Sequence, residues 1–474
     1  MSKRRTDETL DPKDWGSMKK LAKKMAEDMI DYQETIEERP ILKPKTEQII
    51  EYFKQPAPEE PLGPEKTYEE FQEYFVQNKG SYIAHPCLWG GVVGQGTALG
   101  ALADMWSSGM NAQTGSLEIT FDLEMQVLQW IKEMIEYPLD SSGILGSGGS
   151  MANLIGLNVA RNSMAGFDVN ELGCNRNLIF YGSTENHVSI QRDLEVLGVG
   201  NKNLRVIPTD EEYKIDIGLL KEQVEKDRKD GLTPVCVIGN SGSTNVGAID
   251  DLDALASFCK EENLWFHVDG AFGAWVKLSP KYRHMVKGQE KADSIAIDLH
   301  KWMYMPYGIG CTLVKDEDAH YNTYQMNPVY VPHTSRTLSD FTFEQSRSLR
   351  ALKAWMSIKE HGVGKYRRQI EKNIDQAKYL GKLVEESPLL ELVAPVNLNV
   401  VCMRHYVDGL SEDELSILNN KIFSMMFQDP KFGFLTSKLN EKVFMRICIT
   451  NHRTKFEHID QFIDWFTQKV KSLH

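Results

Sequence analysis

The chain has 474 residues and a formal net charge of −13, with 54 lysine and arginine residues against 67 aspartate and glutamate residues. Its length exceeds what one hydrophobic core usually holds, so two or three domains are expected. The acidic balance argues against a nucleic-acid-binding protein, which normally needs a dense basic face. No apolar run approaches the roughly 18 residues of a membrane span.

The cysteines and the N-terminal sequence bear on the compartment. The seven cysteines are widely spaced, odd in number and without any CxxC pair. This pattern favours a reducing compartment and argues against a disulfide scaffold and a zinc site. The sequence MSKRRTDETLDPKDW has no apolar core for a signal peptide. We therefore expect a cytoplasmic protein without a metal site.

Residues 1–85 are charged and helix-prone. The segment MKKLAKKMAEDMIDYQETI carries apolar residues at helical spacing, and the proline-rich segment KQPAPEEPLGPE follows it. We expect this part to be a helical appendage rather than part of the main core.

Residues 86–345 alternate between helical segments and short β-branched or aromatic runs. The runs are NLIFYG, LRVIPT, TPVCVIGN, LWFHVDG, DSIAID and GCTLVK. Such alternation predicts an α/β domain, with a mainly parallel sheet covered by helices on both faces. Ligands of such sheets bind beyond the carboxyl ends of the strands.

Three groups within this domain point to one cofactor. ILGSGGSMANL is a glycine- and serine-rich turn leading into a helix-like segment, an arrangement whose N–H groups suit a phosphate. Asp269 ends the run LWFHVD, and Lys301 follows the run DSIAID. An aldehyde-binding lysine and a carboxylate for a ring nitrogen are the main protein attachments of pyridoxal 5′-phosphate (PLP). A surface lysine and a turn aspartate are the alternatives.

After residue 346, a long helical stretch beginning at EQSRSLRALKAW leads to further predicted strands in LELVAP, LNVVCMR and KVFMRICIT. We interpret residues 346–474 as a smaller α/β C-terminal domain.

In their order and separation, four motifs resemble those of the PLP-dependent group II amino-acid decarboxylases. These are GGSMAN, ENHVSIQRDLEVLG, HVDGAFG and DLHKW. The family includes aromatic amino-acid, tyrosine, histidine, glutamate and cysteine-sulfinate decarboxylases, and the likeness covers nearly the whole chain. It implies PLP-dependent fold type I, with a seven-stranded, mainly parallel sheet, and decarboxylation of an L-amino acid to an amine and carbon dioxide.

The resemblance implies a role for each matching residue. Lys301 would form the Schiff base with the cofactor aldehyde, Asp269 would pair with the pyridine nitrogen, and Ala271 would pack against the ring. His187 would stack over the ring and approach the substrate carboxylate. The remaining predicted cofactor contacts, chiefly to the phosphate, are Gly149, Ser150, Thr244 and His300, with Ser147 as a weaker candidate. Ordinary core packing or loop hydrogen bonding is the alternative for these residues.

Tyr330, in NPVYVPHTSRTL, matches the tyrosine on the mobile catalytic loop of family decarboxylases. The resemblance implies that it protonates the α carbon after carbon dioxide leaves, which favours amine formation over oxidative deamination. Arg350 matches a family arginine near the active site, and a helix-surface salt bridge is the alternative.

The substrate side chain is the hardest feature to predict. Gly91, Val92 and Gly94 stand where aromatic relatives place bulky residues. A carboxylate-bearing substrate would need an arginine or several polar donors, for which Gln95 and Gln113 are candidates. We favour an aromatic substrate, because small residues make room for a ring that Trp89 or Trp106 could line. An acidic or small aliphatic substrate is the alternative.

Other functions use similar groups. A carbon–carbon lyase of the sphingosine-phosphate type would share the lysine and aspartate, as would an aminotransferase, and a cofactor-binding protein without catalysis is the non-enzyme alternative. The resemblance also implies a homodimer whose catalytic loop reaches the neighbouring active site. We expect the N-terminal helix to pack across the two subunits rather than on a membrane.

Overall fold

The computed structural model describes residues 9–114, 118–174, 177–326 and 336–472. The chain forms two compact units, Met1–His85 and Pro86–His474. The second unit holds two sheets, of seven and four strands. The predicted domain boundary at residue 345 stays a prediction.

The first unit is helical. It contains α1 (Trp15–Glu34), α2 (Glu47–Tyr52), α3 (Pro64–Glu70), the π-helical turn η2 (Phe71–Val76) and the short 3-10 turns η1 (Ile36–Glu38) and η3 (Tyr82–Ala84). Asp14 caps α1 by accepting a hydrogen bond from the Gly16 amide at 2.7 Å. The buried Tyr68 of α3 donates its hydroxyl to Asp28 of α1 at 2.7 Å, which joins the two helices.

The seven-stranded sheet is mostly parallel, as predicted. In spatial order its strands are β1 (Ser142–Gly146), β7 (Gly310–Val314), β6 (Ser294–Asp298), β5 (Trp265–Asp269), β4 (Thr233–Asn240), β2 (Leu178–Ser183) and β3 (Leu204–Ile207). Only β7 runs against its neighbours β1 and β6. All six strands predicted from apolar runs are present. The prediction missed β1, whose short sequence SGILG contains two glycines and no aromatic or valine residue.

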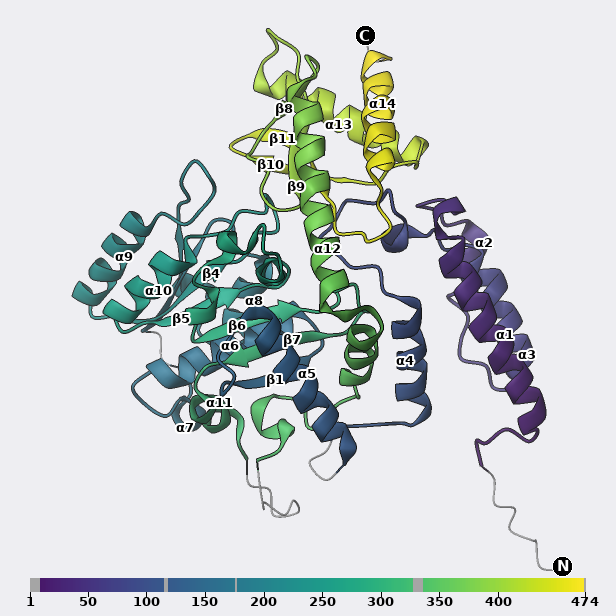
Figure 1. Cartoon of the computed structure of the whole chain (residues 1–474), viewed down its shortest axis with the longest axis horizontal. Coiled ribbons are helices and arrows are strands. Elements are labelled where there is room, and N and C mark those ends of the chain that lie inside the picture. Colours follow the sequence, from purple (N-terminus) through teal and green to yellow (C-terminus); the bar gives the residue numbers. More distant parts are fainter. Residues whose placement is uncertain (1–8, 115–117, 175–176, 327–335, 473–474) are drawn as a thin grey trace, which may run out of the picture. The chain divides into compact units, whose positions relative to one another are not determined.

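Helices cover both faces of this sheet (Figure 1). Along β2, Leu178 and Phe180 pack in one core cluster with α6 (Gly149–Met164) and α8 (Val188–Val196). The alternate residues Ile179 and Tyr181 pack in the other cluster with α9 (Ile217–Lys229) and α10 (Leu252–Glu261). Successive side chains of a strand point to opposite faces, so the alternating pattern builds two hydrophobic layers.

Further helices and 3-10 turns complete this part of the unit. They are α4 (Ala98–Gly109), α5 (Ile119–Ile135), α7 (Val169–Leu172), α11 (Glu317–Tyr324), η4 (Asn201–Asn203), η5 (Gly273–Leu278), η6 (Arg283–Val286), η7 (Gln289–Lys291) and η8 (Leu338–Phe341). Among these, η5 begins shortly after the end of β5 and contacts α5.

The four-stranded sheet is antiparallel, with spatial order β10 (Leu435–Leu439), β11 (Lys442–Cys448), β9 (Val400–His405) and β8 (Leu390–Leu392). It is accompanied by α13 (Glu412–Gln428) and α14 (Phe456–Lys471). The long helix α12 (Ala351–Glu385) contacts α4 and α5 near one end and β8 and β9 near the other (Figure 1). It is interrupted at Gly362, whose φ of 66° is non-helical.

Candidate active site

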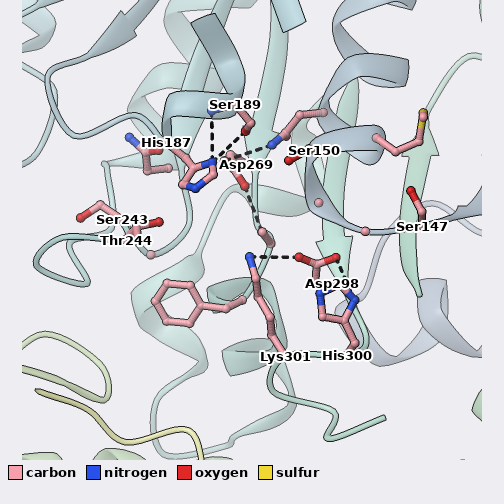
Figure 2. Close-up of a pocket in the computed structure, with 18 of the residues that line it drawn as sticks. Ser147, Ser150, His187, Ser189, Ser243, Thr244, Asp269, Asp298, His300 and Lys301 are labelled. Carbon is pink, nitrogen blue, oxygen red and sulfur yellow. Dashed lines mark hydrogen bonds and ion pairs between the residues drawn. The ribbon is translucent and has the colours of Figure 1, made fainter. Parts of the chain in front are cut away.

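A cavity of about 450 Å³ lies at the carboxyl edge of the seven-stranded sheet. Its walls come from the segments that follow β1, β2, β4, β5 and β6. Because parallel strands end at the same edge, residues far apart in sequence meet there. Nine predicted residues line this one cavity: Ser147, Gly149, Ser150, His187, Thr244, Asp269, Ala271, His300 and Lys301 (Figure 2).

Lys301 enters the cavity from the turn after β6. Its Nζ lies 3.0 Å from Oδ2 of Asp298, the last residue of that strand. Burial by itself would lower the pKa of Lys301, but the carboxylates of Asp298 and Asp269 outweigh it and raise the pKa above the usual value. The unliganded amine is therefore held as an ammonium ion against Asp298.

Gly94 permits a close approach to the backbone of the turn that carries Lys301. Its amide donates to the His300 carbonyl at 3.1 Å, and a β-carbon on it would lie 2.1 Å from the His300 carbonyl oxygen and 2.4 Å from that of Lys301. Only glycine permits this approach of two backbones. Gly94 thus positions the lysine turn and does not make room for a substrate ring, contrary to the prediction.

His300 forms the wall beside Lys301. Its Nδ1 donates to the Ile309 carbonyl at 2.8 Å, and its ring lies against Tyr307 with the centroids 4.8 Å apart. Burial lowers the pKa of His300. The ring is consequently neutral, with its orientation fixed by the backbone.

Asp269 is the last residue of β5, the strand beside β6, and it lines the cavity together with Lys301. Its Oδ1 accepts from the Ala271 amide at 3.1 Å and its Oδ2 from Asn153 Nδ2 at 3.2 Å. The side chain is nearly buried. Both oxygens therefore act as acceptors, and the carboxylate faces the cavity with its direction set by neutral N–H donors.

The first turn of α6 forms one wall. No side chain caps this helix, which begins at Gly149. A β-carbon at Gly148 would lie 2.8 Å from His300 Cε1, and one at Gly149 would lie 2.7 Å from Asp298 Oδ2. The two glycines let His300 and Asp298 approach the start of this helix, whose first N–H groups form an arrangement that can bind an anionic group such as phosphate.

His187 caps α8 and borders the cavity. Its Nδ1 accepts from the Ser189 amide at 3.2 Å and lies 2.8 Å from the Ser189 hydroxyl. Burial lowers the pKa of His187. Since an amide can only donate, Nδ1 is unprotonated and the single proton of the neutral ring is on Nε2.

Several predicted residues lie elsewhere. Trp89 is fully buried, where its Nε1 donates to the Pro86 carbonyl at 2.9 Å, and Trp106 is 61% exposed on α4. Neither lines the cavity, so their predicted role is wrong for the described residues. Arg350 directly precedes α12 and forms a two-point ion pair with Glu344 at 2.8 and 2.9 Å. This is the salt bridge that the sequence left open as the alternative.

The other candidates for the substrate side of the site are likewise outside the cavity lining. These are Gly91, Val92, Gln95 and Gln113. Gln95 donates to the Val93 carbonyl at 2.6 Å, and Val92 is part of the core. Tyr330 lies outside the described residues.

Among the polar residues of the cavity that sequence reasoning missed are Asp298 and Asn153. Both stand inside quoted motifs, DLHKW and GGSMAN. An aspartate three residues before the lysine was a usable signal, because a strand end followed by a turn brings such residues together. For Asn153, which meets Asp269 across 116 residues, no local signal exists.

The sequence matches the family "Pyridoxal-dependent decarboxylase conserved domain" over residues 96–406. The chain belongs to this family. An aromatic-L-amino-acid decarboxylase of Bacillus atrophaeus is 32% identical over 96% of this chain and 95% of its own length. Tyrosine decarboxylase 2 of Narcissus pseudonarcissus is 26% identical over 96% of this chain and 94% of its own length.

Solved structures of family members share the fold. Oryza sativa TDC with PLP and tryptamine matches with a TM-score of 0.90 at 21% identity, covering 98% of this chain and 100% of that chain. Mouse CSAD matches with a TM-score of 0.89 at 21% identity, covering 96% of this chain and 99% of that chain. The decarboxylase fold predicted from the motifs, PLP fold type I, is confirmed.

The protein is therefore a PLP-dependent amino-acid decarboxylase, and its cavity fits the cofactor. It brings together an amine, a carboxylate with acceptor oxygens, and a helix start that no side chain of the described residues caps. In addition, the buried Oδ1 of Asp298 accepts no hydrogen bond from the described residues. This oxygen can therefore accept a hydrogen bond from a donor group of a bound molecule. Among those residues, no helix is long and apolar enough to cross a lipid bilayer.

Proposed function

We propose that this decarboxylase converts an aromatic L-amino acid to the corresponding amine and carbon dioxide. The observation that carries this proposal is the 32% identity, over 96% of the chain, to a protein named aromatic-L-amino-acid decarboxylase. The cavity supports it, because no arginine is among its described lining residues. A substrate with a second carboxylate would need such a partner.

In this proposal Lys301 would hold the cofactor aldehyde, and Asp298, 3.0 Å from its Nζ, would accept the proton that the amine must lose. Asp269 would pair with the ring nitrogen and favour its protonated form. Bound PLP supplies an electron sink for the pair of electrons left at the α carbon when carbon dioxide departs. The amides at Gly149 and Ser150, with the hydroxyls of Ser150 and Thr244, would hold the phosphate.

The remaining walls orient the substrate. Ala271 follows Asp269 and leaves room for a flat ring beside β5. His187 would stack over that ring and offer its Nε2–H to the substrate carboxylate, while His300 would line the phosphate side. A neutral histidine suits this task, since it holds the carboxylate without the strong ion pair that would oppose its loss.

We assign the protonation of the α carbon to Tyr330. Relatives of this chain include proteins named phenylacetaldehyde synthase, at 25% identity, so the family forms both amines and aldehydes. Tyr330→Phe should lower the amine yield and release aldehyde, ammonia and peroxide in air. Amine formation at the parental rate would remove Tyr330 from this role.

We further propose a cytoplasmic homodimer in which residues 1–85 pack across the subunits and Tyr330 serves the neighbouring site. Mixing two variants that are each deficient in amine formation tests this arrangement. A hybrid of Lys301→Ala and Tyr330→Phe subunits contains one site with wild-type Lys301 and the wild-type Tyr330 of the other subunit. Recovered amine formation supports a shared site, whereas a dead mixture of confirmed hybrids, or an active monomer in light scattering, contradicts it.

The substrate itself is tested by incubating the PLP-loaded protein with each common amino acid, DOPA and cysteine sulfinate, and measuring amine and carbon dioxide by mass spectrometry. Amines from tryptophan, tyrosine, phenylalanine or DOPA support the proposal. Amine from glutamate, aspartate or cysteine sulfinate alone would overturn the aromatic assignment. Carbon–carbon cleavage without carbon dioxide would point to lyase chemistry instead.

A further inference from the structure

A chain of hydrogen bonds runs from the interior of the sheet to Asp269. Trp265 Nε1 donates to Ser294 Oγ at 2.8 Å, and the same oxygen lies 2.8 Å from His267 Nδ1. His267 Nε2 lies 2.9 Å from Asn153 Oδ1, and Asn153 Nδ2 donates to Asp269 Oδ2 at 3.2 Å. Trp265, Ser294, His267 and Asn153 are called the Asp269 relay below.

The chemistry of the groups gives the relay one direction. The carboxylate of Asp269 accepts, so the amide of Asn153 must turn its nitrogen toward it and its oxygen toward His267. That oxygen can only accept, hence His267 Nε2 carries a proton. Burial lowers the pKa of His267 to about 4, which leaves the ring neutral and Nδ1 free to accept from the Ser294 hydroxyl.

The packing around His267 restricts rotation of its imidazole ring. His267 and Ser294 are fully buried, and Asn153 is 1% exposed. A β-carbon on Gly156 of α6 would lie 2.7 Å from His267 Cε1 and 3.2 Å from Ser294 Oγ. Glycine at this position lets the helix close onto the imidazole, so the ring cannot flip without moving α6.

We propose that the Asp269 relay is a positioning device for the cofactor ring: it turns the Asp269 carboxylate to the ring nitrogen and presents it there as an acceptor. Asn153 reaches the cavity, whereas His267 and Ser294 act through it. The inference rests on the proposed role of Asp269. If the relay fails, the carboxylate loses a donor and can rotate or take up a proton, and the ring nitrogen loses its fixed partner.

The test compares two ligands of the apo protein, PLP and its analogue with a carbon in place of the ring nitrogen. Their dissociation constants are measured by titration for the wild-type protein and for His267→Leu. Because only PLP has a nitrogen for Asp269, His267→Leu should weaken PLP about tenfold more than the analogue, the scale of one hydrogen bond to a charged group. His267→Gln restores an N–H toward Asn153 and should recover most of this preference.

Two further variants separate positioning from general damage. Ser294→Ala keeps the imidazole and should reduce the preference for PLP by a smaller factor, which keeps the test available if His267→Leu does not fold. His320→Leu is the matched control, since His320 is another fully buried histidine bonded to a strand serine, Ser142, at 2.8 Å but distant from the cavity lining. It should leave the preference for PLP unchanged.

The outcomes are distinct. Equal weakening of both ligands in the His267 and Ser294 variants, with a clear wild-type preference for PLP, would overturn the relay and leave the role of Asp269 intact. A wild-type protein that binds both ligands equally would overturn the role of Asp269 and the relay with it. The predicted pattern is a strong preference in the wild type, loss in His267→Leu and recovery in His267→Gln.

Discussion

The ends of β5 and β6 are neighbours in the sheet, and each finishes in an aspartate. At the end of β5, Asp269 accepts hydrogen bonds from two neutral groups, the Ala271 amide and Asn153. At the end of β6, Asp298 is paired with the Lys301 ammonium group and its Oδ1 accepts nothing from the described residues. One residue type in one strand position thus serves two purposes, and the surroundings make the difference.

The two aspartates differ in what they can do: Asp269 is a hydrogen-bond acceptor in a fixed orientation, and Asp298 is an ion-pair partner that can exchange a proton with Lys301. Neutral donors orient Asp269 and leave its charge available for a ring nitrogen. Asp298 instead stabilises the ammonium form of Lys301, which must lose a proton before its amine can attack an aldehyde. We therefore expect substitutions at the two ends to affect different steps.

The largest effect is expected for Lys301→Ala, which removes the covalent attachment at the β6 end. The visible absorbance of bound cofactor should disappear and kcat/KM should fall by at least about 10³-fold, as for other lost nucleophiles. Lys353→Ala is the matched control, because Lys353 is also buried and paired with an aspartate, Asp104, at 3.0 Å. An unchanged absorbance spectrum in Lys301→Ala would place the cofactor lysine elsewhere.

The next largest effect distinguishes the two aspartates directly. Asp269→Asn keeps the shape but removes the charge that faces the ring nitrogen, so kcat should fall by about 10²- to 10³-fold, the scale of a lost electrostatic contact in a transition state. Asp298→Asn should lower kcat by less than about tenfold, since this residue acts before turnover. Steady-state kinetics on both variants measure the two decreases in kcat. Equal decreases would contradict the proposed difference in role between Asp269 and Asp298.

The neutral imidazole of His267, within β5, predicts that the free energy of unfolding depends on pH. The folded-state pKa of His267 is about 4, against 6.5 for an ordinary histidine. The unfolded chain therefore takes up the proton first, and the stabilisation present above pH 6.5 is lost as the pH falls toward 4. The loss is about 3 kcal/mol. Urea denaturation at pH 7 and pH 4 should show a smaller pH effect in His267→Gln than in the wild type, and an identical effect would contradict a neutral imidazole.

The smallest expected effect concerns cofactor loading at the β6 end. Asp298 raises the pKa of Lys301 against the opposing effect of burial, so Asp298→Asn should lower that pKa and increase the fraction of neutral amine near pH 7. The rate at which visible absorbance appears after PLP is added to the apo protein should rise about tenfold for each unit by which the pKa falls. Slower loading would show that Asp298 helps the attack in another way.

The sequence was sufficient for the site because the chemistry is concentrated at strand ends. The runs LWFHVD and DSIAID end in Asp269 and Asp298, and Lys301 lies one turn further on. Alternating helices and apolar runs predict parallel strands, and parallel strands bring their ends to one edge. Asp269 and Lys301 could therefore be expected at one edge of the sheet from the pattern alone, whereas His187 was assigned through the resemblance to the decarboxylase family.

The sequence did not predict the positions of residues whose contacts join segments distant in the chain, because no hydrophobic periodicity marks such contacts. Trp89 and Trp106 were expected near a substrate, yet one is fully buried and the other largely exposed. Gly94 was assigned to the substrate pocket, but its place is set by the backbone of the lysine turn, some 200 residues later. Nothing local distinguishes a glycine that makes space from one that permits a close approach.

What the sequence alone determined is the family, the α/β architecture, and the lysine, carboxylate and glycine-rich turn that we propose to receive PLP, because each depends on residue type and local order. Only the tertiary structure decided that Asp298 pairs with Lys301 and that His267 stands behind Asp269 through Asn153, which is 114 residues away in the chain. Hydrogen bonds between elements depend on distances of a few ångströms, and these are fixed by packing of helix on sheet rather than by the order of residues.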